Sequence, residues 1–327
     1  MENIKQKYSV IIPLYNKAPY VRKALESVVA QTYRNFELII VDDGSTDNSA
    51  SICEEYLMDH GSWLSAEIIH QKNAGVAAAR NNGVKACKGD YIVFLDADDW
   101  WKPNFLEEIN KLIIEHPDAG LYVTNYIYYK PGKTHVALNI PSGLMNYPEV
   151  YLHNALIPIT SITVCVPKRV FDTIGGFPLG IKLGEDFLLW AKISMHYPIY
   201  YTNQPLAYYN HDIPASARAT RNLHAPEYHM IFHLDSIESE IQQTSKNEPQ
   251  TLVWHMLLDK LRVAALLPYW LSKDYHEEAV AELAKVDWNK QPKSVIRQYK
   301  MPLWVMKMKR NVLNTGSYVK QKIHKLI

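Results

Sequence analysis

The chain has 327 residues, of which 47% are hydrophobic and 21% are charged, and its formal net charge is +1. These ordinary globular values exclude a wholly disordered chain, and the length leaves room for one large α/β domain with a smaller addition. The glycines and prolines are too few and too scattered for a collagen or a low-complexity linker.

Strand and helix patterns alternate along the first part of the chain. Apolar, β-branched runs predict strands, and amphipathic stretches predict the helices between them. The expected strands are 8–14, 36–41, 66–70 and 91–95, and the expected helices are 19–31, 45–59, 76–87 and 104–115. Unbroken apolar strands between helices are typical of a parallel sheet covered on both faces. We therefore predict a doubly wound, mainly parallel sheet in an α/β/α sandwich.

Beyond residue 120 the alternation continues and then gives way to helices. Further strands are expected at 121–129, 162–166 and 206–209, with a helix at 185–195, and later helices at 231–241, 250–271 and 275–286. The change of character predicts a first domain of residues 1–218 and a helical C-terminal region of residues 219–327.

Charge and cysteines bear on the surroundings of the protein. Residues 290–327 contain ten Lys or Arg and no Asp or Glu, which leaves a net −9 for residues 1–289. An acidic body with a basic tail predicts an anionic partner for the tail. Cys53, Cys87 and Cys165 form no Cys-x-x-Cys pair, so we expect buried thiols in a reducing compartment.

The sequence shows neither a secretory signal pattern nor a transmembrane pattern. The first residues contain no positively charged region followed by an apolar stretch, and no apolar run reaches about 18 residues. We expect a cytoplasmic protein, or one that lies peripherally on the inner face of the cell membrane.

Polar and acidic residues follow three of the predicted strands. The first strand ends in Pro13-Leu-Tyr-Asn16, the second in Asp42-Asp-Gly-Ser45, and the fourth in Asp96-Ala-Asp-Asp99. In a doubly wound sheet, ligands bind outside the carboxyl ends of the strands. Clustered carboxylates repel one another unless a cation or hydrogen-bond donors balance them. Each segment alone is better explained as a turn, but three at adjacent strand ends indicate a binding site.

The spacing of Asp96 and Asp98 is typical of carboxylates that share a divalent cation. Mg²⁺ prefers one or two protein carboxylates together with phosphate oxygens, and a metal held in this way neutralises a departing diphosphate. The chain lacks the Gly-x-x-x-x-Gly-Lys-Ser/Thr loop, the Gly-x-Gly-x-x-Gly turn and the Gly-x-Ser-x-Gly elbow. These absences disfavour a P-loop NTPase, a dinucleotide dehydrogenase and an α/β-hydrolase.

Taken together, the motifs resemble those of family 2 glycosyltransferases in order and spacing. They are segments 9–16, 41–47, 73–81 and 94–99, with Gly175-Gly-Phe177 and Gly184-Glu-Asp186, and the resemblance covers about residues 6–218. It implies a glycosyltransferase-A fold, a nucleotide-sugar donor, a divalent cation (Mn²⁺ or Mg²⁺) and inversion at the anomeric carbon. Among the donors, a UDP-sugar is the one we expect. The absence of membrane spans and of a Gln-x-x-Arg-Trp motif favours a non-processive enzyme.

The resemblance also implies roles for individual residues. Those expected to contact the nucleotide sugar are Pro13, Tyr15, Asn16, Asp42, Arg80 and Asp96. In this set Asp42 would accept a hydrogen bond from the base, Asp96 would contact the ribose, and Arg80 would approach the diphosphate. The alternatives are a rim aromatic for Tyr15 and a helix-surface arginine for Arg80.

Further residues are assigned to the metal and to the acceptor. Asp98 and His211 would bind the metal. Asp99 would either bind the metal as well or contact one of its ligands. For His211 a structural or merely exposed position is the alternative. Asp186 would be the general base that takes the proton of the acceptor hydroxyl, and Glu185 would shape the acceptor site. Alternatively, Glu185 and Asp186 have no role in the reaction and only stabilise the N-terminus of a helix through their negative charges.

We therefore expect an enzyme that moves a sugar to a hydroxyl of a glycan or lipid-linked acceptor, in surface polysaccharide synthesis. One alternative is a sugar-nucleotide nucleotidyltransferase, although segment 13–19 lacks the glycine-rich loop that it would need. The other is a non-catalytic nucleotide- or carbohydrate-binding module, which the presence of Asp98 and Asp186 disfavours. For the tail, residues 290–327, we prefer an anionic membrane surface over packing on the domain, and expect no nucleic acid.

Overall fold

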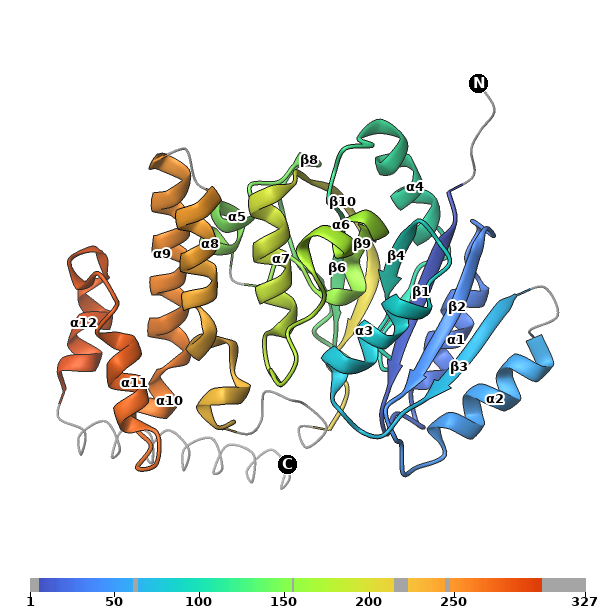
Figure 1. The fold of residues 1–327 in the computed structure, drawn as a ribbon, viewed down its shortest axis with the longest axis horizontal. Helices are drawn as coiled ribbons and strands as arrows, with labels where there is room; N and C mark the ends of the chain where they lie inside the picture. Colours follow the sequence, from blue (N-terminus) through green and yellow to red (C-terminus); the bar gives the residue numbers. More distant parts are fainter. Residues whose placement is uncertain (1–5, 61–63, 155, 215–222, 245–247, 302–327) are drawn as a thin grey trace. The chain divides into compact units, whose positions relative to one another are not determined.

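The structure is a computed structural model that describes residues 6–60, 64–154, 156–214, 223–244 and 248–301 (Figure 1). The chain forms two compact units, residues 1–254 and residues 255–327. The predicted boundary at residue 218 stays a prediction. Most of the basic tail, residues 302–327, lies outside the described residues.

The first unit is built around a mainly parallel sheet with the strand order β3-β2-β1-β4-β9-β6-β10-β5. The strands are β1 (Tyr8–Leu14), β2 (Phe36–Asp42), β3 (Ser65–His70), β4 (Tyr91–Phe94), β5 (Trp100–Trp101), β6 (Leu121–Tyr129), β7 (His135–Val136), β8 (Gly143–Leu144), β9 (Val164–Pro167) and β10 (Ile199–Asn210). Strand β9 runs antiparallel between β4 and β6, and β5 runs antiparallel to β10. The predicted α/β class with a mainly parallel sheet is confirmed.

Helices cover both faces of this sheet (Figure 1). They are α1 (Val21–Val29), α2 (Ser49–His60), α3 (Val76–Ala86), α4 (Phe105–Glu115), α6 (Lys168–Ile174) and α7 (Glu185–His196), with α5 (Tyr147–His153) and α8 (Asp235–Thr244) beside α7. Alternate residues of β1, such as Val10 and Ile12, join the core under α1, α2 and α4. On the other face Ile11 touches Gly83 of α3, and Phe94 of β4 packs against Phe171 of α6.

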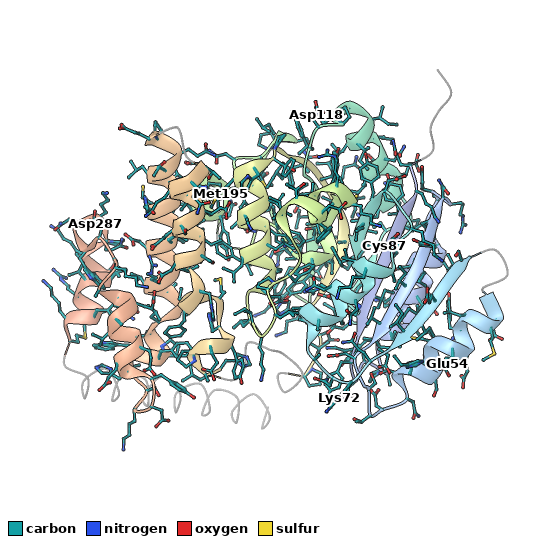
Figure 2. The ribbon with its side chains drawn as sticks, viewed as in Figure 1. Glu54, Lys72, Cys87, Asp118, Met195 and Asp287 are labelled. Carbon is teal, nitrogen blue, oxygen red and sulfur yellow. The ribbon has the colours of Figure 1, made fainter. Side chains whose placement is uncertain are left out.

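The parallel strands bring their carboxyl ends to one edge of the sheet. In register, Leu14 of β1 pairs with Asp42 of β2, which in turn pairs with His70 of β3. Figure 2 labels one residue at each end: Lys72 in the loop after β3, and Asp118 in the turn before β6. The polar segments therefore gather at the Lys72 end, as expected for parallel strands.

The structure differs from the sequence-based expectation in several elements: β5, β7, β8, α5, α6 and a helix near the C-terminus, α12 (Lys293–Lys300), were not predicted, and α8 begins at Asp235 instead of residue 231. The strand expected at 206–209 is β10, which begins at Ile199 and has irregular register around Pro205. The helix expected at 250–271 is divided into α9 (Glu248–Ala265) and α10 (Leu267–Trp270). Pro268 explains the division, because its ring nitrogen has no N–H to continue the helical hydrogen bonds.

The second unit contains the end of α9, α10, α11 (His276–Leu283) and α12 (Lys293–Lys300). Its interior holds an ion pair between buried Arg262 and Glu282, with 3.3 Å between Nε and Oε2. The Tyr299 hydroxyl of α12 donates to the Val263 carbonyl at 2.7 Å. In the part of the chain that the structure describes, no helix combines the length and apolar character needed to cross a membrane. The cysteines are free and buried, as expected; Cys87 is labelled in Figure 2.

Candidate active site

The loop after β1 is tied to the loop after β2 through Asn16. Its side-chain Oδ1 accepts from the backbone N–H groups of Thr46 at 2.8 Å and Asp47 at 3.3 Å, and its own N–H donates to Ser45 Oγ at 3.1 Å. Asn16 has a φ of +52°, which is positive for no other non-glycine residue in the described ranges. Asparagine adopts this left-handed conformation more readily than most residues, and the hydrogen bonds to Ser45, Thr46 and Asp47 hold it there. Asn16 therefore fixes the geometry of the rim, while Tyr15 beside it is 46% exposed.

Lys17 follows in the same loop and reaches the carboxylates after β4. Its N–H donates to Ser49 Oγ at 2.7 Å, and its Nζ lies 2.7 Å from Asp98 Oδ2. The two charged side chains are 21% and 14% exposed. Asp98, expected to bind a metal, is thus paired with an ammonium group.

The neighbouring acids Asp42 and Asp43 have different partners. Asp42 Oδ1 accepts from Ser45 N–H at 3.0 Å, and its Oδ2 lies 3.2 Å from Nδ1 of His70. Asp43 accepts from Gln71 Nε2 and from two backbone N–H groups just before α3, at 2.7–2.8 Å. Asp43 therefore shapes the loop into α3, whereas Asp42 is combined with a half-exposed histidine. Pro13 is buried in β1 beyond the end of β4, where its lack of an N–H disrupts no ladder.

Arg80 joins three elements of the site. It lies on α3 with only 4% of its side chain exposed. One terminal nitrogen donates to Asp96 Oδ1, after β4, and the other donates to Glu185 Oε1, at the start of α7, both at 2.8 Å. A planar guanidinium is suited to hold two carboxylates at fixed positions. The predicted contact of Arg80 with a diphosphate stays a prediction.

Asp99 is the buried member of the acidic segment. Its Oδ1 accepts from the Asn210 N–H at 2.7 Å, while its Oδ2 is buried without a hydrogen-bond partner among the described residues. Burial and the negative charges of Asp98 and Asp96 hold the pKa of Asp99 well above its ordinary value. The Asn210 side chain also donates to the Asp98 carbonyl at 3.1 Å. The end of β10 therefore fixes the segment that carries Asp98.

Asp186 stands in the first turn of α7, which begins after the left-handed Gly184. Its Oδ1 accepts from the Phe187 N–H at 2.8 Å. Burial, and then the charge of Glu185, raise the pKa of Asp186 to about 7, although the Arg80 guanidinium acts in the opposite direction. A carboxyl group with such a pKa can accept a proton near neutral pH.

Aromatic side chains adjoin these acids. His211 follows Asn210, and its ring stacks on Tyr128 with 3.9 Å between ring centroids. Tyr209, whose pKa is raised first by burial, is also affected by the charges of Asp99, Asp96 and Asp186. Tyr209 therefore lies near Asp96 and Asp99, which follow β4, and also near Asp186 of α7. Ligation of a metal by His211 stays a prediction.

Among the described residues, direct hydrogen bonds between side chains link three of the residues predicted from the sequence. Direct bonds connect Asp96, Arg80 and Glu185, whereas Tyr15 has no such bond among the described residues. No group of three or more His, Cys, Asp or Glu is placed to hold a metal ion in the described ranges. Arg218 and Arg221, which could also contact a diphosphate, lie outside them.

Three residues of the site were not predicted from the sequence: Lys17, His70 and Asn210. Each stands at, or just after, the carboxyl end of a strand that was itself predicted. That position was the available signal, since side chains there face the same edge as the acids. The assembled site combines a basic side chain and acids at this edge of the sheet with Asp186 at the start of α7, whose pKa is about 7.

Comparison with known proteins identifies relatives by sequence and by fold. The sequence model of Glycosyl transferase family 2 matches residues 9–180. Glycosyltransferase GlyA of Streptococcus pneumoniae is 34% identical over 206 residues, which cover 59% of this chain and 28% of GlyA. The chain thus corresponds to little more than a quarter of that relative.

Two solved structures share the fold. The structure of S. aureus TarS 1–349 in complex with UDP-GlcNAc superposes with a TM-score of 0.70 at 20% identity, covering 85% of this chain and 79% of that one. Mannosyltransferase PcManGT from Pyrobaculum calidifontis, in complex with GDP-Man and Mn²⁺, superposes with a TM-score of 0.51 at 18% identity, covering 88% and 89%.

Proposed function

Since the chain belongs to glycosyl transferase family 2, we propose that it transfers a sugar, with inversion, from a nucleoside-diphosphate sugar to a hydroxyl group. The acceptor is a glycan or a lipid-linked glycan, and the pathway is surface polysaccharide synthesis. The observation that carries the proposal is the chain of contacts Asp96–Arg80–Glu185, because it links the acidic edge of the sheet to the start of α7, where the neighbouring Asp186 has a pKa of about 7.

The donor binds across the carboxyl ends of β1, β2 and β4. The base lies near Asp42 and Tyr15, and Asp96 accepts from the ribose with the oxygen that Arg80 does not use. The TarS and PcManGT structures contain UDP-GlcNAc and GDP-Man, which supports a nucleoside-diphosphate sugar as the donor class. Among the nucleoside-diphosphate sugars, the donor that we propose is a UDP-sugar.

A divalent cation fits the residues at this edge. Asp98 offers a partly exposed carboxylate oxygen, and Asp99 Oδ2 is a buried oxygen without a hydrogen-bond donor among the described residues. Hard oxygen donors of this kind suit Mg²⁺ and Mn²⁺, which complete their coordination with phosphate oxygens. Asp98 would hold the ion, with His211 as the second protein ligand, and the ion would neutralise the charge of the leaving diphosphate.

The residues of the chain account for the transfer step as follows. The acceptor oxygen forms a bond to the anomeric carbon as the bond from that carbon to the diphosphate oxygen breaks. The proton of the acceptor hydroxyl moves to Oδ2 of Asp186, whose Oδ1 is held by the Phe187 N–H. Attack from the face opposite the leaving group inverts the configuration at that carbon. Arg80 holds Glu185 and Asp96, so that the base and the donor site keep their spacing.

Calorimetric titration with UDP, GDP, CDP and dTDP, each with Mn²⁺ or with EDTA, tests the proposal. We expect one diphosphate to bind with Mn²⁺ and at least tenfold more weakly with EDTA. In Asp186→Asn this binding should persist, while release of nucleoside diphosphate from the matching sugar donor falls by about 10³-fold. Asp172→Asn, an exposed acid of α6, is the matched control and should keep both. Folded protein that binds none of the four would overturn the proposed function.

A further inference from the structure

The pair formed by Lys17 and Asp98 has a consequence for the order of binding at the site. The ammonium group lies 2.7 Å from Oδ2 of Asp98, the carboxylate to which the proposed function assigns the cation. A divalent cation and an ammonium group at one carboxylate repel each other, so each weakens the binding of the other to that carboxylate. In the donor-free protein the cation therefore competes with Lys17 for Asp98.

The backbone under Lys17 is fixed, so its side chain is the part free to move. Asn16 is held in its positive-φ conformation by the loop after β2, and the Lys17 N–H is bonded to Ser49 Oγ at 2.7 Å. A lysine has a compact charge on a flexible stem with three donors, so rotation of the stem redirects the charge without moving the loop. Oxygens of a diphosphate beside Asp98 would be the next acceptors within its reach.

We propose that Lys17 is a positioning residue that neutralises Asp98 in the donor-free protein. When the donor arrives, the ammonium group of Lys17 moves from Asp98 to the diphosphate. The inference rests on the proposed function. Cation and diphosphate then both favour the state in which Lys17 has left Asp98. Each must strengthen binding of the other by the same factor, since coupling between two sites is reciprocal. The cation binds tightly only together with the nucleotide.

Direct Mn²⁺ binding measures this coupling without any turnover. Water-proton relaxation reports bound Mn²⁺, and it is recorded with and without the nucleoside diphosphate that the wild type binds in calorimetry. For the wild type we expect weak Mn²⁺ binding alone and a five- to 150-fold gain with nucleotide, which is the usual range of such coupling. In Lys17→Met, Mn²⁺ alone should bind at least about fivefold more tightly, and the gain should shrink toward one.

Two further variants separate charge from structure. Lys17→Arg keeps a cation at the site and should retain most of the coupling. Lys111→Met removes an exposed lysine of α4 that pairs with Glu108 and should behave as the wild type. In addition, Lys17→Met should bind the diphosphate less well in EDTA. Melting temperatures recorded on the same samples establish that each variant is folded.

The outcomes distinguish this inference from the proposed function. If the wild type binds a nucleoside diphosphate with Mn²⁺ but Lys17→Met shows the same Mn²⁺ affinity and the same coupling, the inference is wrong and the proposed function stands. Loss of coupling in Lys111→Met as well would also overturn it, because the effect would not belong to Lys17. If the wild type binds none of the four diphosphates, the proposed function fails and the inference fails with it.

Discussion

At the scale of single residues, Asp186 combines a partly buried position with a nearby positive charge. Burial and Glu185 raise its pKa to about 7, and Arg80 limits the rise. A general base acts in its ionised form, so kcat/KM should increase with pH through about 7 and then level off. A pH profile of donor turnover for the wild type measures this. A profile that is flat between pH 5 and 8, or that falls through 7, would exclude Asp186 as the base.

Arg80 is the residue whose removal should affect stability and the pH profile together. Arg80→Gln leaves the buried carboxylate of Glu185 and that of Asp96 without their common cation, and breaking a buried pair costs about 3–5 kcal/mol. Because Arg80 lowers the pKa of Asp186, the midpoint of the pH profile should also move to higher pH. Urea unfolding and the pH dependence of kcat/KM measure the two effects.

Arg80→Lys serves as the comparison for that variant. A lysine keeps the charge but cannot bridge two carboxylates with a planar fork. The midpoint should therefore stay near that of the wild type, while part of the stability is lost. Equal midpoints in Arg80→Gln and the wild type would contradict the electrostatic role.

At the scale of elements, local patterns predicted most strands and helices, and the contacts between them could not be predicted. The apolar, β-branched run 8–14 and the alanine-rich stretch 76–87 have compositions typical of a strand and of a helix, and both form the expected element. In contrast, Lys17 and Asp98 are 81 positions apart, and Arg80 and Glu185 are 105 apart. No periodicity encodes such a pair, because it depends on how the helices lie on the sheet.

The start of α7 depends on Gly184, where both the backbone conformation and a close neighbour disfavour any larger residue. Its φ is +86°, and an added Cβ would lie 2.3 Å from Cγ of Met230. Gly184→Ala should therefore cost about 3 kcal/mol of the free energy of unfolding, from backbone strain and overpacking together. It should also reduce turnover, because Asp186 stands two residues further along α7. Thermal and urea unfolding, with the turnover assay, measure both.

Gly180 offers a matched control for that substitution. Its φ is +85°, yet no atom lies within 4 Å of the position that a Cβ would take. Gly180→Ala should then cost only the backbone strain, about 1 kcal/mol, and leave turnover unchanged. Equal costs for the two alanine variants would show that the contact with Met230 is unimportant.

At the scale of the whole molecule, positive charge is concentrated at one end of the sequence. Residues 1–289 carry a net −9, and residues 290–327 carry +10. Within the second unit, Lys293, Arg297 and Lys300 of α12 are exposed, while the half-buried Tyr299 is bonded to Val263. The hydrophobic contacts of α12 thus leave its basic side chains turned to solvent, where an anionic surface can reach them.

We therefore expect the full chain to bind vesicles that contain phosphatidylglycerol and not vesicles of phosphatidylcholine alone. Each lysine or arginine near an anionic surface contributes about 1 kcal/mol, so replacing Lys293, Arg297 and Lys300 by Gln should weaken binding by roughly 100-fold. Co-sedimentation at low and high salt measures this, and salt should reduce binding because it screens the attraction.

The control for the vesicle experiment removes the same charge from the other unit. Lys111, Lys130 and Lys133 are exposed lysines of the first unit, and their replacement by Gln should leave vesicle binding close to that of the wild type. If both triple variants lose binding equally, attraction follows net charge and not the basic C-terminal region. If neither loses it, or if vesicles of phosphatidylcholine bind equally well, the anionic-surface interpretation of residues 290–327 is wrong. Only selective loss in the α12 variant supports a membrane contact through this region, because it alone ties the attraction to the place where the charge is concentrated.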